Sequence, residues 1–363
     1  MTTGELDQVK AGEFLAKVVT DSAGASVAIL CELGDRLGLF KSMAGQPPAT
    51  AEEVATRADL NERYTLEWLR GMRAGGYVTY DADSDTYHFP DEHAAVLAAE
   101  SGPLFIAPGF RMFPPLIEQL PKLAEAFRHG GGVPQSAYSA DWWENMGRFT
   151  AGWYQNQLIE EWIPAIPASM EKLEQGAEAA DIGCGSGWAV IRLAEAFPRS
   201  RFVGFDVVPE QVQLATANAE RAGVSDRASF VAIDAADGLP SSFDLITTFD
   251  ALHEANDPRA VLAAVRSALK DDGTYLMSEM NCCDRHEENI TPLHALFYTL
   301  SLTYCLTTVM SHGGAALGTC GLPEAEVRRL CEEVGFSSVA RLDPSPGVVS
   351  VASVENILYE IRP

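Results

Sequence analysis

The sequence predicts an α/β fold, with a parallel sheet in its C-terminal half and a smaller, mainly helical unit before it. From residue 177 onward, short β-prone runs alternate with amphipathic helical stretches, which is the order of βαβ units. The first of these runs ends in the glycine-rich stretch "DIGCGSG", residues 181–187. Residues 1–95 instead contain three helical patterns followed by a hairpin pattern. That order is typical of a winged helix.

The elements of the N-terminal unit follow from local signals. Residues 25–40 carry apolar side chains at helical spacing, and Thr50 and Glu53 have the spacing of a capping box that begins a short helix. A further helix over 65–74 ends at Gly75 and Gly76. Two β-prone runs flank the turn "DADSD" and predict a hairpin within 77–89.

The rest of the chain divides into a connector and the sheet domain. Residues 96–175 contain frequent prolines and the break "HGGGVP", with a long helix expected over 141–163. We therefore predict a winged-helix-like domain at 1–95, a helical connector at 96–175 and the sheet domain at 176–363. Within the last, "RFVGFD", "SFVAID", "FDLITTF" and "GTYLMSE" are expected strands, and "SSVARL" and "ASVENILYEI" supply two late strands.

Composition restricts the possible partners and the compartment. The chain has 363 residues, of which 47% are hydrophobic and 21% charged, as in soluble globular proteins. A formal charge of −25 disfavours binding to nucleic acid and to anionic membranes. The N-terminus lacks a signal-peptide pattern, and the most apolar stretch, 292–310, is interrupted by His294 and favours a buried helix. Seven scattered cysteines indicate a reducing compartment, so a cytoplasmic location is expected.

The glycine-rich turn does not have the spacing of the common phosphate-binding turns. Gly183, Gly185 and Gly187 alternate, and the bulky Trp188 stands where a dinucleotide fingerprint needs a small residue. No Gly-Lys-Ser/Thr follows, so a P-loop is excluded. The turn therefore predicts a ligand without phosphate that lies against the main chain.

Two acids follow the next two strands. Asp206 ends the second strand, 19 residues after Gly187, where an acid can accept hydrogen bonds from both hydroxyls of a ribose. Asp234 ends the third strand, where an acid can accept from an exocyclic amine such as that of adenine. Together the three strand ends fit adenosine with a zwitterionic tail.

These motifs resemble those of the class I S-adenosylmethionine-dependent methyltransferases. "DIGCGSG", "FVGFD", "IDAADGLP" and "FDLITTFDALH" look like the first four motifs of that family. The resemblance implies a Rossmann-like seven-stranded sheet and S-adenosylmethionine as cofactor, with S-adenosylhomocysteine as product. The loop after Asp234 is one residue longer than the common pattern. The implied cofactor-binding residues are Asp181, Gly183, Gly185, Gly187, Asp206, Val207, Asp234, Ala235 and Phe249.

The order of the domains resembles bacterial small-molecule methyltransferases and plant-type O-methyltransferases. In those families the N-terminal domain is a dimerisation element that also helps close the substrate pocket, so a homodimer is expected. A DNA-reading domain is the alternative. Residues 50–93 contain four Arg, no Lys and ten acids, and this sign of charge is the opposite of what DNA binding needs.

His253 is the candidate general base for a hydroxyl acceptor. "LHEAND" resembles the "LHDWxD" stretch of plant-type O-methyltransferases, in which this histidine is the base, although Ala255 replaces the tryptophan. An ordinary pKa of about 6.5 suits a base at neutral pH. Glu279 ends the fifth strand, where it could orient His253 or contact the acceptor. Candidate acceptor-binding residues are Trp143, Tyr154, Phe297, Met310 and His312.

Other chemistries stay open on the sequence alone. No metal site is expected, because Cys282 and Cys283 are adjacent and lack the C-x-x-C spacing of zinc sites. A methyltransferase acting on nitrogen, carbon or sulfur, or on a metalloid held by cysteines, would need no histidine base. A protein that binds the cofactor without transferring methyl, and a DNA-binding regulator, are the remaining alternatives. Each has its own signature: activity that survives loss of His253, binding without turnover, or affinity for duplex DNA.

Overall fold

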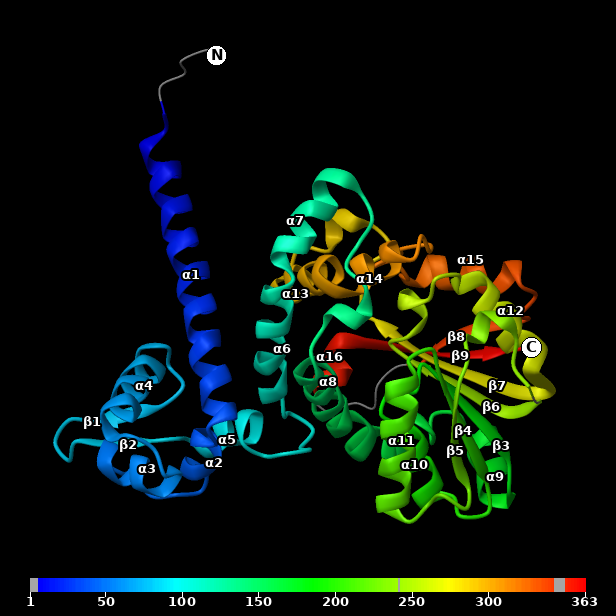
Figure 1. Ribbon diagram of the computed structural model, residues 1–363, viewed down its shortest axis with the longest axis horizontal. Coiled ribbons are helices and arrows are strands. Elements are labelled where there is room, and N and C mark those ends of the chain that lie inside the picture. Colours follow the sequence, from blue (N-terminus) through cyan, green and yellow to red (C-terminus); the bar gives the residue numbers. More distant parts are fainter. Residues whose placement is uncertain (1–5, 241, 343–349) are drawn as a thin grey trace. The chain divides into compact units, whose positions relative to one another are not determined.

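The computed structural model describes residues 6–240, 242–342 and 350–363. The chain forms two compact units, Met1–Phe113 and Pro114–Pro363 (Figure 1). Residues 114–175 of the expected connector lie in the second unit. The three-part division with boundaries at 95 and 175 stays a prediction.

The first unit confirms the predicted order of helices and hairpin. Its elements are α1 (Gln8–Arg36), α2 (Leu39–Met43), α3 (Ala51–Ala58), α4 (Glu62–Ala74), β1 (Thr79–Asp81), β2 (Thr86–His88) and α5 (Asp91–Leu97), and α6 (Ala107–Glu118) begins in it. The capping box is present: the Glu53 amide donates to Thr50 Oγ1 at 3.3 Å, and the Thr50 amide donates to Glu53 Oε2 at 2.8 Å. Phe40, Trp68 and Phe89 pack at the centre of the core of this unit.

Helix α1 is longer than its apolar pattern predicts. It begins at Gln8, where the Asp7 side chain accepts from the amides of Val9 and Lys10, rather than near residue 25. An Asp or Ser cap satisfies amides that have no partner within a helix, which favours the early start. Apolar side chains along α1 are nonetheless exposed, namely Val9, Phe14, Leu15, Val18, Val19, Ile29 and Leu33.

Two helices in the described part of the chain have the length and composition of a membrane span. They are Gln8–Arg36, with 6% of its most apolar window buried, and Pro292–Ser311, with 50% buried. The second is the stretch that the sequence favours as a buried helix. It packs one face inward through Phe297, Tyr304 and Val309 and leaves Tyr298 and Met310 exposed.

The second unit confirms the predicted seven-stranded sheet. Its strands are β3 (Glu178–Ile182), β4 (Arg201–Asp206), β5 (Ala228–Ala232), β6 (Phe243–Phe249), β7 (Leu269–Met280), β8 (Ser338–Leu342) and β9 (Asn356–Arg362). They lie in the order β5-β4-β3-β6-β7-β9-β8, and only β9 runs antiparallel to its neighbours. Strand order reverses beside β3, because β4 lies on one side of it and β6 on the other. Such a switch point is where open α/β sheets bind ligands.

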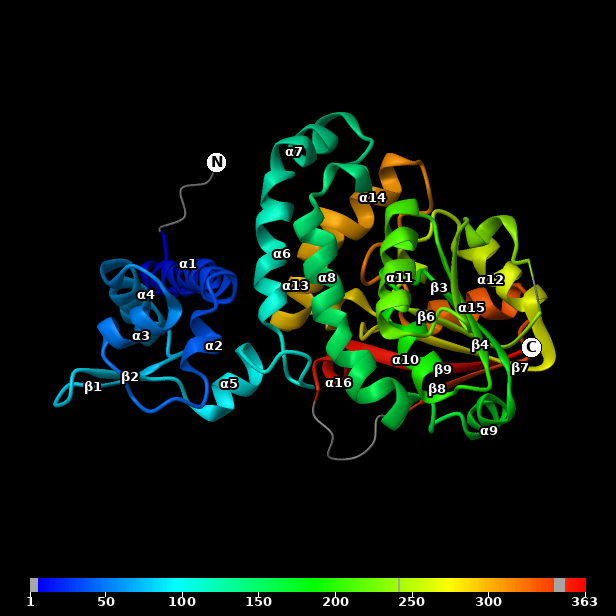
Figure 2. The ribbon, with the colours of Figure 1, turned by 60° about the horizontal axis from the view of Figure 1, so that its bottom comes forward.

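Helices cover both faces of this sheet (Figure 2). Alternate residues of a strand point to opposite faces, so Ala179 and Leu245 pack with α9 (Pro167–Gln175), α10 (Trp188–Ala196) and α11 (Pro209–Ala222). Ala180 and Ile246 pack with α12 (Pro258–Ala268) and α15 (Glu324–Glu333) on the other face. The short α16 (Val351–Glu355) precedes β9. Two separate cores result, and the carboxyl edge of β3, β4 and β6 stays between them.

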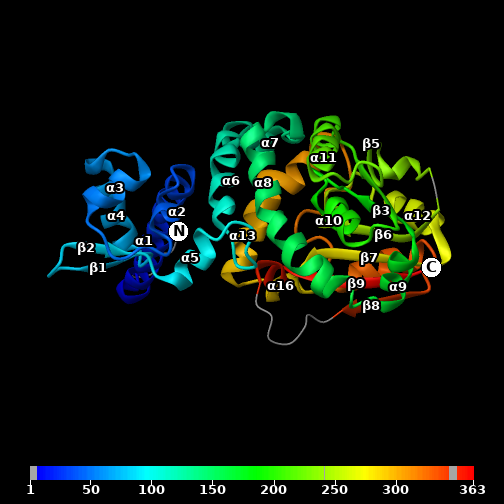
Figure 3. The ribbon, with the colours of Figure 1, turned by 90° about the horizontal axis from the view of Figure 1, so that it is seen from below.

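Helices from two distant parts of the chain pack together beside that edge (Figure 3). After α7 (Leu120–His129), α8 (Ala140–Trp153) continues into a π-helix, Tyr154–Trp162. An insertion after β7 forms α13 (Pro292–Leu300), a π-helical turn (Ser301–Cys305) and α14 (Leu306–Ser311). The ring centroids of Trp142 and Tyr304 are 4.4 Å apart, which joins the two sets of helices. Both helix irregularities lie next to the site described below, as π-turns frequently do.

Candidate functional site

The turn between β3 and α10 presents its main chain to open space. The amides of Gly183 and Cys184 donate to the Phe205 carbonyl at 2.8 and 3.1 Å, which fixes the turn to β4. Gly183 and Gly185 have φ values of 72° and 50°, a left-handed region that favours glycine. A Cβ on Gly183 would lie 2.4 Å from Ala251 Cβ, whereas a Cβ on Gly185 would meet nothing within 4 Å. The main chain is therefore packed against Ala251 at Gly183, whereas the space next to Gly185 is open.

Asp206, at the end of β4, closes one side of this space. Its Oδ2 accepts from the Gly185 amide at 2.8 Å, and its Oδ1 accepts from the Val208 amide at 2.9 Å. A carboxylate offers about four acceptor positions, so each oxygen keeps capacity for a hydroxyl donor. Burial raises the pKa of Asp206, and the backbone amides of Val208 and Gly185 oppose that effect. Val207 beside it is 56% exposed, an apolar surface suited to a flat ring.

Asp234 and Ala235 begin the turn that follows β5. Asp234 Oδ1 accepts from the Ala236 amide at 2.9 Å and caps the short 3-10 turn Ala235–Asp237. Ala235 is buried against the second core. One oxygen of Asp234 is thus engaged by the backbone, and the other is the one left for an amine donor.

Asp181 and Phe249 lie below the open edge rather than on it. Asp181 is 3% exposed, and its Oδ1 accepts from Thr247 Oγ1 at 2.6 Å. Burial raises its pKa to about 7, with the Thr247 hydroxyl opposing the shift. Phe249 stacks on Trp162 with ring centroids 5.3 Å apart and meets Tyr154 edge-on at 5.4 Å. These residues form the floor of the site.

Replacing Asp181 with asparagine is expected to change how stability depends on pH. The folded-state pKa of about 7 exceeds the ordinary 3.8, so the folded chain holds a proton that the unfolded chain releases. The free energy of unfolding therefore falls as pH rises from about 4 to 7, by up to about 4 kcal/mol. Urea denaturation of Asp181→Asn across this range should give a shallower decline. Glu178→Gln, at an exposed position of the same strand, is the matched control, and equal slopes in wild type and Asp181→Asn would contradict the assignment.

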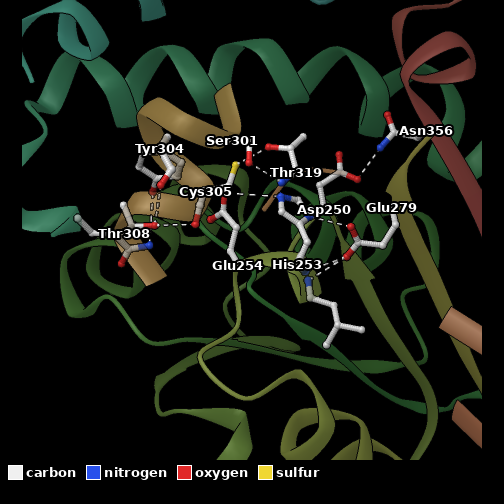
Figure 4. A network of polar contacts seen from close by, with 12 residues as sticks. Asp250, His253, Glu254, Glu279, Ser301, Tyr304, Cys305, Thr308, Thr319 and Asn356 are labelled. Atoms are coloured by element: carbon white, nitrogen blue, oxygen red, sulfur yellow. Dashed lines mark hydrogen bonds and ion pairs between the residues drawn. The ribbon is translucent and has the colours of Figure 1, made fainter. Parts of the chain in front are cut away.

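His253 is held by Glu279 in the buried network of Figure 4. Nδ1 of His253 lies 2.7 Å from Glu279 Oε2, and Glu279 Oε1 accepts from the amides of Leu252 and His253 at 3.0 and 3.3 Å. His253 and Glu279 are 1% and 0% exposed. Burial lowers the pKa of His253, but the Glu279 carboxylate and the Cys305 sulfur outweigh it and hold that pKa well above its usual value. The ring orientation is fixed, which leaves Nε2 to face away from Glu279.

The loop that carries His253 adjoins the glycine turn. A Cβ added to Gly183 would lie 2.4 Å from Ala251 Cβ, so this loop packs directly against the turn. Asp250 begins the loop with φ 54°, and its Oδ1 accepts from Asn356 Nδ2 at 2.5 Å and from Ser278 Oγ at 3.3 Å. Burial raises the pKa of Asp250 to about 7. The strand-end loops of β3 and β6 thus bring Gly183 and His253 to the same edge.

Sequence reasoning considers Cys305 only as one cysteine of the metalloid alternative, and it misses three other residues of this network: Asp250, Glu254 and Asn356. Asp250 and Glu254 lie within the motif around His253, so their proximity to it was available as a signal. Cys305 and Asn356 come from the insertion and from β9, and no local pattern marks them. Cys282 is buried and Cys283 exposed, and the neighbouring Cys320 and burial raise the pKa of the Cys282 thiol.

The expected acceptor-binding residues occupy different environments. Trp143 is half-buried, with its ring centroid 6.0 Å from that of Tyr304, and Tyr154 packs edge-on to Phe249. Phe297 is 1% exposed and packs against His294 within the insertion. Met310 is 41% exposed, and His312 is exposed where α14 ends. Tyr154 therefore contacts Phe249 at the end of β6, and Trp143 contacts the insertion through Tyr304.

Two parts of the chain match known families. Residues 25–99 match the family described as the Rv2258c-like winged HTH domain, and residues 173–315 match the family described as a methyltransferase domain. The ubiquinone biosynthesis O-methyltransferase of Idiomarina loihiensis is 28% identical over 150 residues. That match covers 40% of this chain and 58% of the relative.

Solved structures share the fold over nearly the whole chain. A candidate O-methyltransferase from Nostoc punctiforme PCC 73102 superposes with a TM-score of 0.70 at 17% identity, covering 96% of this chain and 99% of that one. The structure described as PigF with SAH superposes with a TM-score of 0.67 at 20% identity, covering 95% and 98%. At such identities the likeness shows the fold.

Proposed function

We propose that this chain, in which residues 25–99 form a winged helix-turn-helix domain and residues 173–315 a methyltransferase domain, methylates a hydroxyl group of a small organic acceptor with S-adenosylmethionine. The observation that carries the proposal is the His253–Glu279 pair, buried beside the glycine turn with Nε2 directed away from Glu279. A base in that position serves transfer to oxygen, because a hydroxyl loses its proton as it attacks.

In this proposal the cofactor lies along the carboxyl edge of β3, β4 and β5. Its aminoacyl tail would lie over Gly185, where the main chain is open, and Asp206 would accept from the ribose hydroxyls. Val207 would contact the adenine ring, and Asp234 would accept from its amine. Phe249 and Asp181 would support these contacts as buried residues near the carboxyl ends of β6 and β3.

The transfer step is an in-line displacement at the methyl carbon. Bound S-adenosylmethionine would supply this carbon: a bond from the acceptor oxygen would replace the carbon–sulfur bond, whose electron pair would stay with the sulfur as the neutral thioether. The hydroxyl proton passes to Nε2 of His253. Glu279, hydrogen-bonded to Nδ1, positions the ring and stabilises the imidazolium that forms, as the raised pKa of His253 indicates. Proximity and alignment of the reacting atoms supply much of the remaining rate enhancement.

A crystal structure with S-adenosylhomocysteine tests this arrangement. We expect ribose hydroxyls within hydrogen-bond distance of Asp206 and the thioether sulfur facing a cavity that His253 Nε2 borders. A sulfur that faces away from His253 would favour methyl transfer without this base, to nitrogen, carbon or sulfur. Density for a dinucleotide in the same place would contradict the proposal.

The homodimer is part of this proposal, with α1 as the interface. Leu15, Val18, Ile29 and Leu33 are exposed, and their spacing of three or four residues, continued through Ser22 and Ser26, places them along one stripe of the helix. The same stripe on a second copy is its natural complement, because a two-fold interface uses one patch twice. The charge of −25 argues against nucleic acid and against an anionic membrane as the occupant. We also place the protein in the cytoplasm, since all seven cysteines are free thiols.

The double variant Val18→Glu/Ile29→Glu is expected to be monomeric. The two copies would bring four carboxylates, two from each α1, into an apolar interface without counter-ions. Light scattering during size-exclusion chromatography should give twice 39.2 kDa for the wild type and 39.2 kDa for the variant. Thr20→Glu, on another face of α1, is the matched control. A monomeric wild type that sediments with phosphatidylcholine vesicles would instead assign the stripe to a membrane.

A further inference from the structure

His253, Glu254 and Cys305 converge on one point from two elements (Figure 4). His253 and Glu254 lie in the short 3-10 turn Leu252–Glu254 after β6, and Cys305 ends the π-helical turn of the insertion. One ligand atom from each of the three side chains lies within 4.8 Å of the other two, and His253 Nε2 lies 3.8 Å from Glu254 Oε1. An imidazole nitrogen, a carboxylate oxygen and a sulfur are the three ligand types of protein zinc sites.

The imidazole nitrogen at this point is otherwise unused. His253 is 1% exposed, and its Nε2 has no hydrogen-bond partner of ordinary geometry in the part of the chain that the structure describes. A buried polar atom without a partner costs free energy, so such an atom at a cluster of ligands indicates an absent group. The proposed methyl transfer uses this nitrogen only when an acceptor is bound.

The groups around the three side chains are those that support a bound metal. Glu279 engages Nδ1 of His253 at 2.7 Å, the carboxylate–histidine arrangement that orients metal-bound imidazoles. Thr319 Oγ1 donates to Cys305 Sγ at 3.1 Å, which helps to hold the sulfur in place beside His253 and Glu254. Cys305 is 6% exposed, so the sulfur is shielded from bulk solvent. The Glu254 side chain is 24% exposed, which leaves an access route from that side.

We propose that His253 Nε2, Glu254 and Cys305 Sγ bind one divalent transition-metal ion of the Zn²⁺ type, with the fourth tetrahedral position open. Metal–ligand bonds of about 2.0 to 2.3 Å in a tetrahedral site place the ligand atoms roughly 3.3 to 3.8 Å from one another. Small rotations of the Glu254 and Cys305 side chains would bring the three ligand atoms from within 4.8 Å to that spacing. The sulfur and nitrogen ligands disfavour Mg²⁺ and Ca²⁺, which prefer oxygen. On binding, the Cys305 thiol releases its proton to solvent, and the ion's double charge is balanced by one thiolate and one carboxylate.

Metal binding and base catalysis at this position exclude each other. A nitrogen that donates its electron pair to Zn²⁺ cannot accept the proton of an acceptor hydroxyl. This consequence rests on the proposed function, whereas the site itself does not. We therefore expect added Zn²⁺ to suppress methyl transfer and a chelator to restore it.

Cobalt binding tests the site directly. Chelator-treated protein titrated with Co²⁺ is expected to develop a thiolate-to-cobalt charge-transfer band in the near ultraviolet that saturates at one equivalent and disappears when Zn²⁺ is added. Cys305→Ser should abolish the band. Glu254→Gln should weaken metal affinity by more than about tenfold, because even residues that only hydrogen-bond to a metal ligand contribute about 10- to 100-fold to metal affinity. Affinity for S-adenosylhomocysteine, measured in each variant, shows that the fold is intact.

Matched cysteine variants decide where the metal binds. Cys331→Ser, a buried cysteine of α15, should leave the band unchanged, and so should Cys282→Ser, which removes the thiol beside Cys320. A wild type without a band, or a band that survives Cys305→Ser, would overturn the proposal. A band that requires Cys305 and is independent of Cys331 and Cys282 would support the metal site. If methyl transfer were also insensitive to Zn²⁺, His253 would not be the general base.

Discussion

Replacing His253 with alanine is expected to lower the rate of methyl transfer to a hydroxyl by about 10²- to 10⁴-fold, the usual contribution of a general base. Nε2 is the proton acceptor in our account, and the carboxylate nearest to it, that of Glu254, lies 3.8 Å away. Affinity for the cofactor should change little, because the Gly185 and Asp206 contacts are made by other residues. Single-turnover rates with labelled S-adenosylmethionine, measured with a chelator present, check the prediction.

Two further variants separate a catalytic role of His253 from a structural one. His253→Asn keeps a polar side chain in the buried position and should be as slow as His253→Ala, although it leaves a smaller cavity. Glu279→Gln acts through His253, so we expect kcat to fall with little change in KM for the cofactor. Full activity in both His253 variants would rule out the base and favour an acceptor atom that carries no proton to remove.

Because Glu279 raises the pKa of His253 above its ordinary 6.5, the metal-free enzyme should also become faster as pH rises above neutrality. The neutral imidazole is the active form, and its fraction grows until pH passes the raised pKa. The pH dependence of kcat/KM, measured with the chelator present, checks this direction. A rate that falls as pH rises from 6 to 8 would contradict a histidine base held by Glu279.

Replacing Asp206 with alanine is expected to weaken cofactor binding by about 100-fold. The proposed ribose contacts are hydrogen bonds to a charged group, each contributing about 1.5 to 3 kcal/mol, and even one such loss of roughly 3 kcal/mol gives this factor. In the wild type, the Gly185 and Val208 amides donate to the Asp206 carboxylate at 2.8 and 2.9 Å. The variant removes both hydrogen bonds, so the glycine turn is no longer held to the end of β4. Calorimetric titration with S-adenosylhomocysteine measures the change.

Glu210→Gln, an exposed acid in the first turn of α11, is the control for loss of charge near the site. Its affinity should equal that of the wild type. Asp206→Asn, which keeps one acceptor oxygen, should fall between the wild type and Asp206→Ala. An unchanged affinity in Asp206→Ala would mean that the ribose is not held at the end of β4.

The sheet and the cofactor edge could be predicted because their signals are local. The six residues "RFVGFD" coincide with β4, and the three glycines after β3 adopt the left-handed conformations that their spacing suggests. Asp206 is the last residue of that run, so its place at the end of a strand can be predicted from the sequence. Each strand and the glycine turn is marked by residues next to one another in the chain, and the order of the strands places Asp206 beside that turn.

The remainder depends on contacts between distant parts of the chain. Cys305 reaches His253 only because the insertion after β7 folds back over the loop after β6, and Asn356 reaches Asp250 from the last strand. Phe297 carries an apolar ring at helical spacing, which is equally typical of a core residue and of a pocket residue, and it is buried at 1% exposure. The early start of α1 depends on Asp7 as a cap, a weak signal beside the stronger apolar pattern at 25–40.

The nature of the methylated atom is the most direct test of the account. Protein is incubated with S-adenosylmethionine labelled with ¹³C at the methyl group, a panel of phenols, aromatic amines and thiols, and a chelator. The product is examined by ¹³C NMR, which distinguishes methyl groups on oxygen, nitrogen, carbon and sulfur. We predict an O-methyl product that forms with the wild type and is nearly absent with His253→Ala. Label on carbon, nitrogen or sulfur, or no product from protein that binds the cofactor, would contradict it.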